Sequence, residues 1–264
     1  PAAFPWMGDA VAEGVAQLSE MYFEKFATDD SSTEGLFEDY DHANTRVTHM
    51  TVDHDLPLTF WRSVGHSYTA FAKESMIDEI AEAAGMDEVA FRLQNTQNAP
   101  RLNNVIRVAG EHMAKMNPPE GHHLGFAAHN SFLTDVAEIA EVSVENGKIR
   151  VHKVTCVLDC GQAVNPDIVR AQMEGGVVYG LTAALYGGLN LERGTIKESN
   201  FHDYPMLRMN ESPEIEVIII DSGTEPTGVG EPGLPPIAPA VANAVYKATG
   251  QRLRSLPLQL ASAL

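Results

Sequence analysis

A run of glycines and prolines around one acid constrains this chain most strongly. Residues 228–236 read GVGEPGLPP, and Glu231 is the only charged residue among them. Glycine is conformationally permissive and proline lacks a backbone donor, so neither a helix nor a strand can run through this segment. The sequence predicts a loop that brings backbone N–H groups close to a ligand and holds one carboxylate in place. Such an acid suits a general base beside an anionic cofactor, or it is a solvated side chain on a surface loop.

The composition indicates an ordinary globular protein of one large or two small domains. The chain has 264 residues, of which 44% are hydrophobic and 20% are charged. Its 36 acidic and 18 basic residues give a formal charge of −18, which argues against nucleic acid as a partner. No run reaches the ~18 consecutive apolar residues of a membrane span. The chain begins at Pro1 with no signal peptide before it, so we expect a processed product or a part of a longer polypeptide.

The cysteines and histidines form no recognisable metal or redox motif. Cys156 and Cys160 lack the C-x-x-C spacing, and two cysteines cannot ligate an iron–sulfur cluster alone, so we expect packed, reduced side chains. Without an H-E-x-x-H arrangement, His122, His123 and His129 are expected to be loop or packing residues. The nucleophile elbow, the dinucleotide pattern and the P-loop are also missing. We therefore predict no metal bound directly by this chain.

Helical and strand patterns alternate without a regular βαβ period, so the predicted fold class is α+β. Helices are expected at residues 9–26, 67–85, 87–94, 102–116 and 239–249, and another begins after Asn165. Strands are expected at residues 45–52, 214–220 and 252–258, with the best hairpin at 135–160 around an Asn146-Gly147 turn. We divide the chain into a helix-rich part (residues 1–120) and a part with the hairpin, a glycine-bearing helix and the GVGEPG loop (residues 121–264).

Two further segments carry candidate binding residues. Residues 60–67 read FWRSVGHS before a predicted helix, with Ser67 as its expected N-cap. Arg62 either binds an anion at that helix start or is a surface arginine. Residues 159–176 read as a strand end, a tight turn and a helix with glycines in its middle. Helical glycines cost about 1 kcal/mol each relative to alanine, so we expect something to approach that helix backbone closely. Gln172 either bonds a heterocycle or is a surface glutamine.

Taken together, these stretches resemble the molybdenum-cofactor subunit of the molybdenum hydroxylases, the xanthine dehydrogenase and aldehyde oxidase family. The resemblance is closest to the isoquinoline 1-oxidoreductase type and related aldehyde dehydrogenases, and it runs from about residue 35 to 258. Four blocks carry it in the family's order: FWRSVGHS at 60–67, DCGQAVNPDIVRAQMEGG at 159–176, SNFHDYP at 199–205 and GVGEP at 228–232. The combination is more specific than any single block.

The resemblance implies a molybdopterin-dependent oxidoreductase that oxidises an N-heterocycle or an aldehyde with water as the oxygen source. Glu231 would be the base that activates the oxygen nucleophile. Implied cofactor-binding residues are Gln172, Gly228, Val229, Gly230, Arg62, Ser63 and Gly65. Trp61 and Val64 would line the substrate pocket. Val64 stands where xanthine-type members have phenylalanine, which argues against a purine of the xanthine kind.

The resemblance also implies cofactors and partners. The cofactor would be molybdenum on molybdopterin, as the cytosine dinucleotide, and electrons would pass to 2Fe-2S clusters on a small partner subunit. A cytochrome c is a candidate acceptor beyond it. A G-G-F-G block is absent, so the match covers the C-terminal half, and the N-terminal half of the molybdenum subunit is a further partner. Alone, the chain is expected to supply the base and part of the pterin cradle without turnover.

Two alternatives and the cellular compartment stay open at this point. The chain could be a non-catalytic or isolated cofactor-binding domain that serves in assembly. It could also be a generic phosphate- or nucleotide-binding protein, which the missing glycine signatures disfavour. Related subunits occur in the cytoplasm and in the periplasm, soluble or associated with a membrane through partners.

Overall fold

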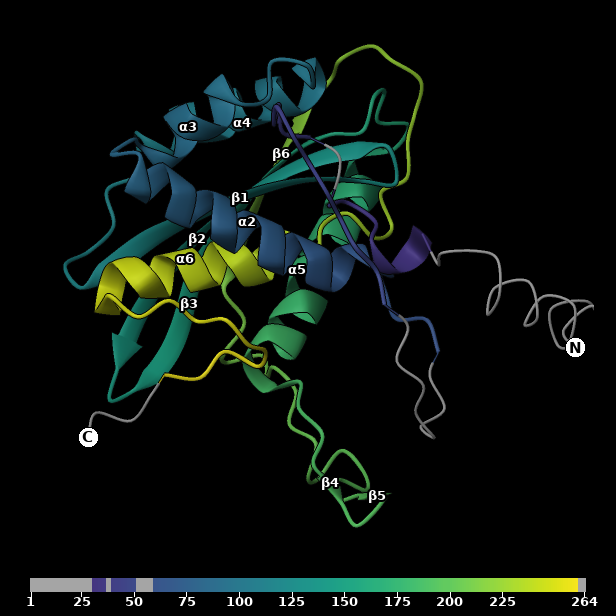
Figure 1. Ribbon diagram of the computed structural model, residues 1–264, viewed down its shortest axis with the longest axis vertical. Helices are drawn as coiled ribbons and strands as arrows, with labels where there is room; N and C mark the ends of the chain where they lie inside the picture. Colours follow the sequence, from purple (N-terminus) through teal and green to yellow (C-terminus); the bar gives the residue numbers. More distant parts are fainter. Residues whose placement is uncertain (1–29, 37–38, 51–58, 261–264) are drawn as a thin grey trace, which may run out of the picture.

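A four-stranded sheet forms the centre of the protein, with helices on both faces (Figure 1). The computed structural model describes residues 30–36, 39–50 and 59–260. The strand order is β1 (His122–Ser131), β2 (Thr134–Glu145), β3 (Lys148–Asp159) and β6 (Glu214–Ile220). The first three strands pair antiparallel, whereas β6 pairs parallel to β3. This mixed architecture confirms the predicted α+β class.

The helices are α2 (His66–Ala83), α3 (Glu88–Gln94), α4 (Pro100–Met113), α5 (Pro166–Tyr186) and α6 (Ile237–Thr249), with a short 3-10 turn η1 (Asp30–Ser32). Helix α5 begins as predicted, because the Asn165 side chain accepts hydrogen bonds from the next backbone N–H groups and Pro166 occupies its first turn. A small ribbon of β4 (Leu191–Glu192) and β5 (Thr195–Ile196) projects beyond the end of α5 (Figure 1). None of the described helices is both long and apolar enough to span a membrane.

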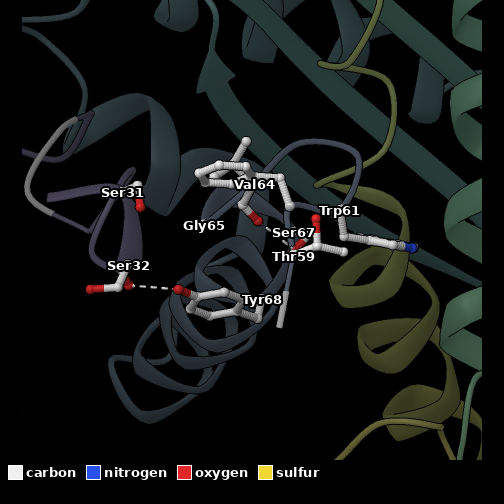
Figure 2. Close-up of a pocket in the computed structure, with 9 residues that line it drawn as sticks. Ser31, Ser32, Thr59, Trp61, Val64, Gly65, Ser67 and Tyr68 are labelled. Carbon is white, nitrogen blue, oxygen red and sulfur yellow. Dashed lines mark hydrogen bonds between the residues drawn. The ribbon is translucent and has the colours of Figure 1, made fainter. Parts of the chain in front are cut away.

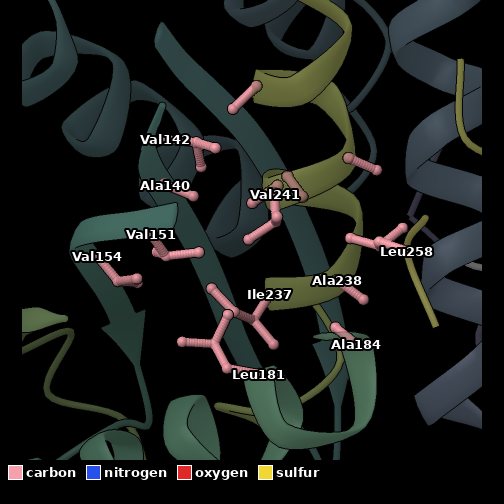
Figure 3. Packing of buried hydrophobic residues seen from close by; sticks show 14 of the residues in the cluster. Ala140, Val142, Val151, Val154, Leu181, Ala184, Ile237, Ala238, Val241 and Leu258 are labelled. Carbon is pink, nitrogen blue, oxygen red and sulfur yellow. The ribbon is translucent and has the colours of Figure 1, made fainter. Parts of the chain in front are cut away.

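The core lies between the sheet and its flanking helices. Helix α4 packs on one face of the sheet, while α5 and α6 pack on the other. Figure 3 shows Ile237 and Val241 of α6 directed toward Val142 and Val151 of the hairpin and Leu181 of α5. Burying a side chain of this size contributes about 1.5–3 kcal/mol. This layer therefore fixes α5 and α6, between which the glycine–proline loop (residues 228–236) runs, against the sheet.

The β2–β3 hairpin and the buried cysteines follow the sequence prediction. Asn146 and Gly147 have φ values of 51° and 73°, as the predicted tight turn requires. Cys156 and Cys160 are free and buried. The strand at 214–220 is also present as β6.

Two strand predictions were wrong, and one strand was missed. Residues 45–50 are mostly exposed and form no strand, and residues 51–52 lie outside the described part of the chain. Residues 252–258 form no strand either, because Arg252 bonds to α2 and the Leu258 N–H donates to Ala184 O at 2.7 Å. Strand β1 was missed because its sequence contains glycine and alanine in place of β-branched residues. Small residues are needed there, since a Cβ on Gly125 would lie 2.1 Å from Ala240 O of α6.

Several helix ends also differ from the predictions. Helix α4 begins at Pro100 and ends at Met113, and α6 begins two residues before Pro239. Ser67 is not the N-cap of α2, because Gly65 occupies that position and the Ser67 Oγ donates to Val64 O at 2.8 Å. The predicted helix at residues 9–26 lies outside the described residues.

Candidate functional site

The glycine–proline loop has no helix or strand before α6 begins, as predicted, and its start is fixed by the turn between β1 and β2. The Gly228 N–H donates to Phe132 O at 3.3 Å. The Thr134 Oγ1 donates to Gly228 O at 2.7 Å. These two bonds tie the loop to the central sheet, so the segment that carries Glu231 leaves from a rigid point.

Arg62 links the middle of the loop to helix α5. Its Nε donates to Gly230 O at 2.9 Å, and its Nη2 contacts the same oxygen. Nη2 also donates to the side-chain oxygen of Gln172 at 3.3 Å. The guanidinium lies 5.7 Å from the centroid of the Tyr179 ring. Arg62 therefore contacts two other predicted site residues, Gly230 and Gln172, that are far from it in the sequence. Gln172 is half-buried and is not a free surface residue.

Ser63 holds the predicted base. Its backbone N–H donates to Glu231 Oε1 at 3.1 Å, and its Oγ donates to the Glu231 backbone oxygen at 2.8 Å. Ser63 is fully buried and Glu231 is half-buried. Within the described residues, Glu231 Oε2 accepts no hydrogen bond. The arrangement fixes one carboxylate oxygen and leaves the other available to a ligand.

The segment that presents Ser63, here called the Ser63 turn (residues 61–65), has an unusual backbone. Ser63 and Val64 have φ values of 70° and 45°. This left-handed region costs about 1–2 kcal/mol per non-glycine residue and is rare for β-branched side chains. The Val64 N–H donates to Trp61 O at 2.9 Å, and Gly65 follows as a buried residue before α2. Strain of this kind is retained where the surroundings enforce it, which occurs often at functional sites.

The middle of α5 is shaped to accept the end of the loop. A Cβ on Gly176 would lie 2.9 Å from the carbonyl carbon of Gly233, and one on Gly180 would lie 2.5 Å from Ile237 Cγ2. Gly175 faces open space. The prediction that something approaches this helix closely is confirmed at Gly176 and Gly180, and the approaching segment is the one that follows Glu231.

A cavity of about 460 Å³ opens beside the Ser63 turn (Figure 2). Trp61 and Val64, the two residues predicted for a substrate pocket, both line it, together with Phe60 and the ring of Tyr68. Figure 2 shows Ser32 across from this group, where its backbone oxygen accepts a hydrogen bond from the Tyr68 hydroxyl at 2.9 Å. The volume lies in the range of roughly 300–1,000 Å³ that is typical of small-molecule sites. Most of its lining surface is apolar, and Ser31, Ser32, Thr59 and Ser67 add hydroxyl groups.

The loop offers donors that suit an anionic group. In the described part of the chain, the backbone N–H groups of Val229, Gly230 and Glu231 have no hydrogen-bond partner. Gly230 has open space on its side-chain face, whereas the side chain of Val229 packs toward α5. Successive free backbone N–H groups form a cradle for anions. The described residues contain no group of three or more His, Cys, Asp or Glu side chains that could hold a metal ion.

Two histidines next to the Ser63 turn were missed as site residues. The Nδ1 of His66, at the start of α2, lies 2.9 Å from the Nε2 of His129 on β1. Burial and the charge of Lys73 lower the pKa of His66 to about 4. Burial also holds the pKa of His129 well below its usual value. The prediction that His129 is a loop or packing residue was right only for packing, because it lies on the missed strand β1.

Comparisons with known proteins identify relatives along most of the chain. The sequence model of the molybdopterin cofactor-binding domain family matches residues 58–213. The beta chain of isoquinoline 1-oxidoreductase from Brevundimonas diminuta is 36% identical over 256 residues, which cover 94% of this chain and 33% of the relative. A component of nicotinate dehydrogenase from Pseudomonas putida is 34% identical over 242 residues, which cover 83% of this chain and 20% of the relative. The chain thus spans a third or less of the length of these two relatives.

A similar fold occurs in solved structures. The aldehyde oxidoreductase from Desulfovibrio desulfuricans superimposes with a TM-score of 0.62 over 75% of this chain and 40% of that protein, at 16% identity. The enzyme of the same name from Desulfovibrio gigas gives a TM-score of 0.57 over the same shares of the two chains, at 14% identity. At these identities the likeness concerns the fold alone.

Proposed function

This chain belongs to the molybdopterin cofactor-binding domain family of the molybdenum hydroxylases, and from that premise we propose that it supplies the catalytic base and part of the cofactor cradle of an oxidoreductase. The substrate class is an N-heterocycle or an aldehyde. Support comes from three relatives, which are named for isoquinoline, nicotinate and aldehyde oxidation.

The observation that carries the proposal is the meeting of three segments at the glycine–proline loop. Arg62 binds the loop backbone and Gln172, and Ser63 binds the carboxylate of Glu231. These contacts join a turn before α2, the middle of α5 and the loop before α6. A solvated glutamate on a surface loop would not require these contacts between three segments. The arrangement instead suits an acid that must stay at a fixed place beside a ligand.

We assign Glu231 as the general base. Ser63 fixes Oε1, so Oε2 is the atom that takes a proton from the water-derived nucleophile. In the overall reaction, a substrate C–H bond and one water yield a C–OH bond, two protons and two electrons. When bound, the molybdenum-bearing pterin supplies the redox centre that accepts those electrons. A positioned base typically accelerates such a step by roughly 10²–10⁴-fold.

The cradle and the pocket have separate residues in this proposal. The free N–H groups at 229–231 bind the anionic cofactor, and the side-chain amide of Gln172 faces the pterin. Arg62, Ser63, Gly65 and Gly228 hold this cradle together. Trp61 and Val64 form the wall of the substrate cavity, whose apolar lining suits a flat, uncharged ring or an aldehyde. The first predicted part of the chain, residues 1–120, thus supplies the turn, and the second part, residues 121–264, supplies the base.

Partners complete the enzyme. Because the chain spans only part of its relatives' length, we propose that the N-terminal half of the molybdenum subunit closes the other side of the site. Electrons then leave to a small 2Fe-2S subunit and onward to a cytochrome c or another acceptor. We propose the cytosine dinucleotide form of molybdopterin.

The proposal is tested on the complete enzyme. Metal analysis should find molybdenum, and hydrolysis of the extracted cofactor should release cytidine monophosphate. Oxidation of isoquinoline or an aromatic aldehyde in ¹⁸O-labelled water with an artificial electron acceptor should place the label in the product. An active preparation without molybdenum, or oxygen drawn from O₂ instead of water, would overturn the assignment of reaction type.

A further inference from the structure

The two buried histidines beside the Ser63 turn form a contact that the proposed reaction does not use. His66 and His129 are 8% and 1% exposed, and their rings meet nearly edge to face, with centroids 5.1 Å apart. The Nδ1–Nε2 distance of 2.9 Å is a hydrogen bond. It joins the first residue of α2 to the central sheet, three residues after the Ser63 N–H that holds Glu231.

The contacts around this histidine pair (His66 and His129) decide which nitrogen carries each proton. His129 Nδ1 is buried and has no partner among the described residues. A bare acceptor lone pair costs less to bury there than an unpaired N–H donor. His129 therefore carries its proton on Nε2 and donates to His66 Nδ1. His66 then carries its proton on Nε2, which lies 3.9 Å from a carboxylate oxygen of Glu34.

The histidine pair is also linked to the loop that carries Glu231. The ring of Phe132 lies 5.5 Å from the ring of His66, and the Phe132 backbone oxygen accepts the hydrogen bond of Gly228. The charged groups that act on the pair come from three segments: Glu34 after η1, Lys73 on α2 with its partner Asp39, and Glu231 on the loop. Lys73 disfavours a proton on His66, whereas Glu231 favours one.

We propose that the His66–His129 pair is a neutral, hydrogen-bonded support that positions the Ser63 turn against Glu231 and keeps a cation away from that carboxylate. This inference rests on the proposed role of Glu231 as a base. His66 and His129 are positioning residues in it, because neither touches the reacting atoms. Such a support is needed because Ser63 and Val64 both have strained, left-handed backbone conformations. Two residues in this conformation persist only where neighbouring contacts enforce it.

Neutrality of the pair has a kinetic consequence. A positive charge beside the Glu231 carboxylate would stabilise its ionised form and make it a weaker proton acceptor. Burial against His129 prevents that charge from forming at His66. If the His129 ring is removed, water enters its space and relieves the burial of His66, so the pKa of His66 should rise toward its ordinary value of about 6.5. The acid limb of the rate profile should then move to higher pH.

The test compares four variants of the histidine pair and one control variant, all in the complete enzyme, with the wild type. His129→Ala should lose activity at a higher pH than the wild type does. The double variant His66→Asn/His129→Ala, which has no titratable ring left at this place, should return the acid limb to its wild-type position even if its plateau rate is low. His66→Asn and His129→Gln each keep the hydrogen-bonding atom that faces the partner, so both should retain the wild-type profile. His112→Gln on α4 serves as a control histidine away from the turn.

Three readouts separate the outcomes. Molybdenum content should stay at the wild-type level in all variants, which shows that the cofactor site is intact independently of turnover. An unchanged acid limb in His129→Ala with the cofactor retained would overturn the inference. A Glu231→Gln enzyme that keeps its turnover would instead overturn the proposed function itself, and that result is distinct from any behaviour of the histidine variants.

Discussion

At the scale of single residues, the candidate site depends on two residues that each make two contacts. Arg62 bonds both Gly230 and Gln172, and Ser63 bonds Glu231 through its backbone and its hydroxyl. Neither role can be seen in the local sequence, where both residues fit a capped helix start equally well. Only the fold shows that the partners of these residues lie at the glycine–proline loop.

Replacing Arg62 by lysine tests the link between the loop and α5. Lysine carries its charge at one point and cannot reproduce the planar fork that bonds two acceptors at once. Loss of one charged hydrogen bond, worth about 1.5–3 kcal/mol, should lower cofactor affinity by roughly tenfold or more. Molybdenum per protein after dialysis measures this loss. Arg107→Lys on the exposed face of α4 is the matched control, and equal molybdenum contents in the two variants would contradict the role of Arg62.

The buried His66 makes stability depend on pH in a stated direction. Its pKa is about 4 in the folded protein and ~6.5 when exposed, so the unfolded state binds more protons between these values. The free energy of unfolding should therefore fall as the pH drops through that window. His66→Asn removes this contribution, so its melting temperature should fall less steeply over the same window. Calorimetry measures the melting temperature at each pH. If the melting temperatures of the variant and the wild type fell equally steeply with pH, His66 would not be buried as a neutral ring.

At the scale of secondary-structure elements, the fit of α5 to the loop controls where Glu231 lies. Gly176→Ala would push a methyl group against the backbone of Gly233. A displacement of a catalytic group by about 1 Å can cost roughly 10²-fold in rate, so kcat should drop strongly if Glu231 is the proposed base. Gly175→Ala on the same helix is the matched control, because its Cβ meets no neighbour and alanine favours the helix by about 1 kcal/mol. Similar kcat values for the two variants, with protein folded in both, would contradict this account.

Elements with strong local patterns could be predicted from the sequence, and those set by tertiary contacts could not. The N-cap at Asn165 and the Asn146-Gly147 turn located α5 and the hairpin because their causes are local. Strand β1 was not predicted because it contains Gly125. Glycine is required there because α6 crosses the strand too closely for a side chain. Residues 252–258 have a strand's composition, but Arg252 bonds to the acidic side chains of α2 instead.

The candidate site follows the same division. Glu231, Arg62, Ser63 and Gln172 could be proposed from sequence blocks, and the structure brings all four together. The histidine pair could not be found, because it requires the register of the missed strand β1.

At the scale of the whole molecule, we propose that the chain offers one side of a site. Within the described residues, its N–H groups at 229–231 and the Oε2 atom of Glu231 have no hydrogen-bond partner. Since the chain spans a third or less of its two sequence relatives, we expect the 264-residue chain alone to bind molybdopterin far below one equivalent. Equilibrium dialysis with the extracted cofactor measures this. Stoichiometric binding would show that the second side of the site is not needed.

The most direct test of the central claim is the turnover number of Glu231→Gln in the complete enzyme, expressed per bound molybdenum. Glutamine keeps the size of the side chain and can still accept the hydrogen bond from Ser63, so molybdenum content should equal that of the wild type. Because the amide cannot take a proton, kcat should fall by roughly 10²–10⁴-fold. A kcat within a few-fold of the wild type at equal molybdenum content would contradict the assignment of Glu231 as the base.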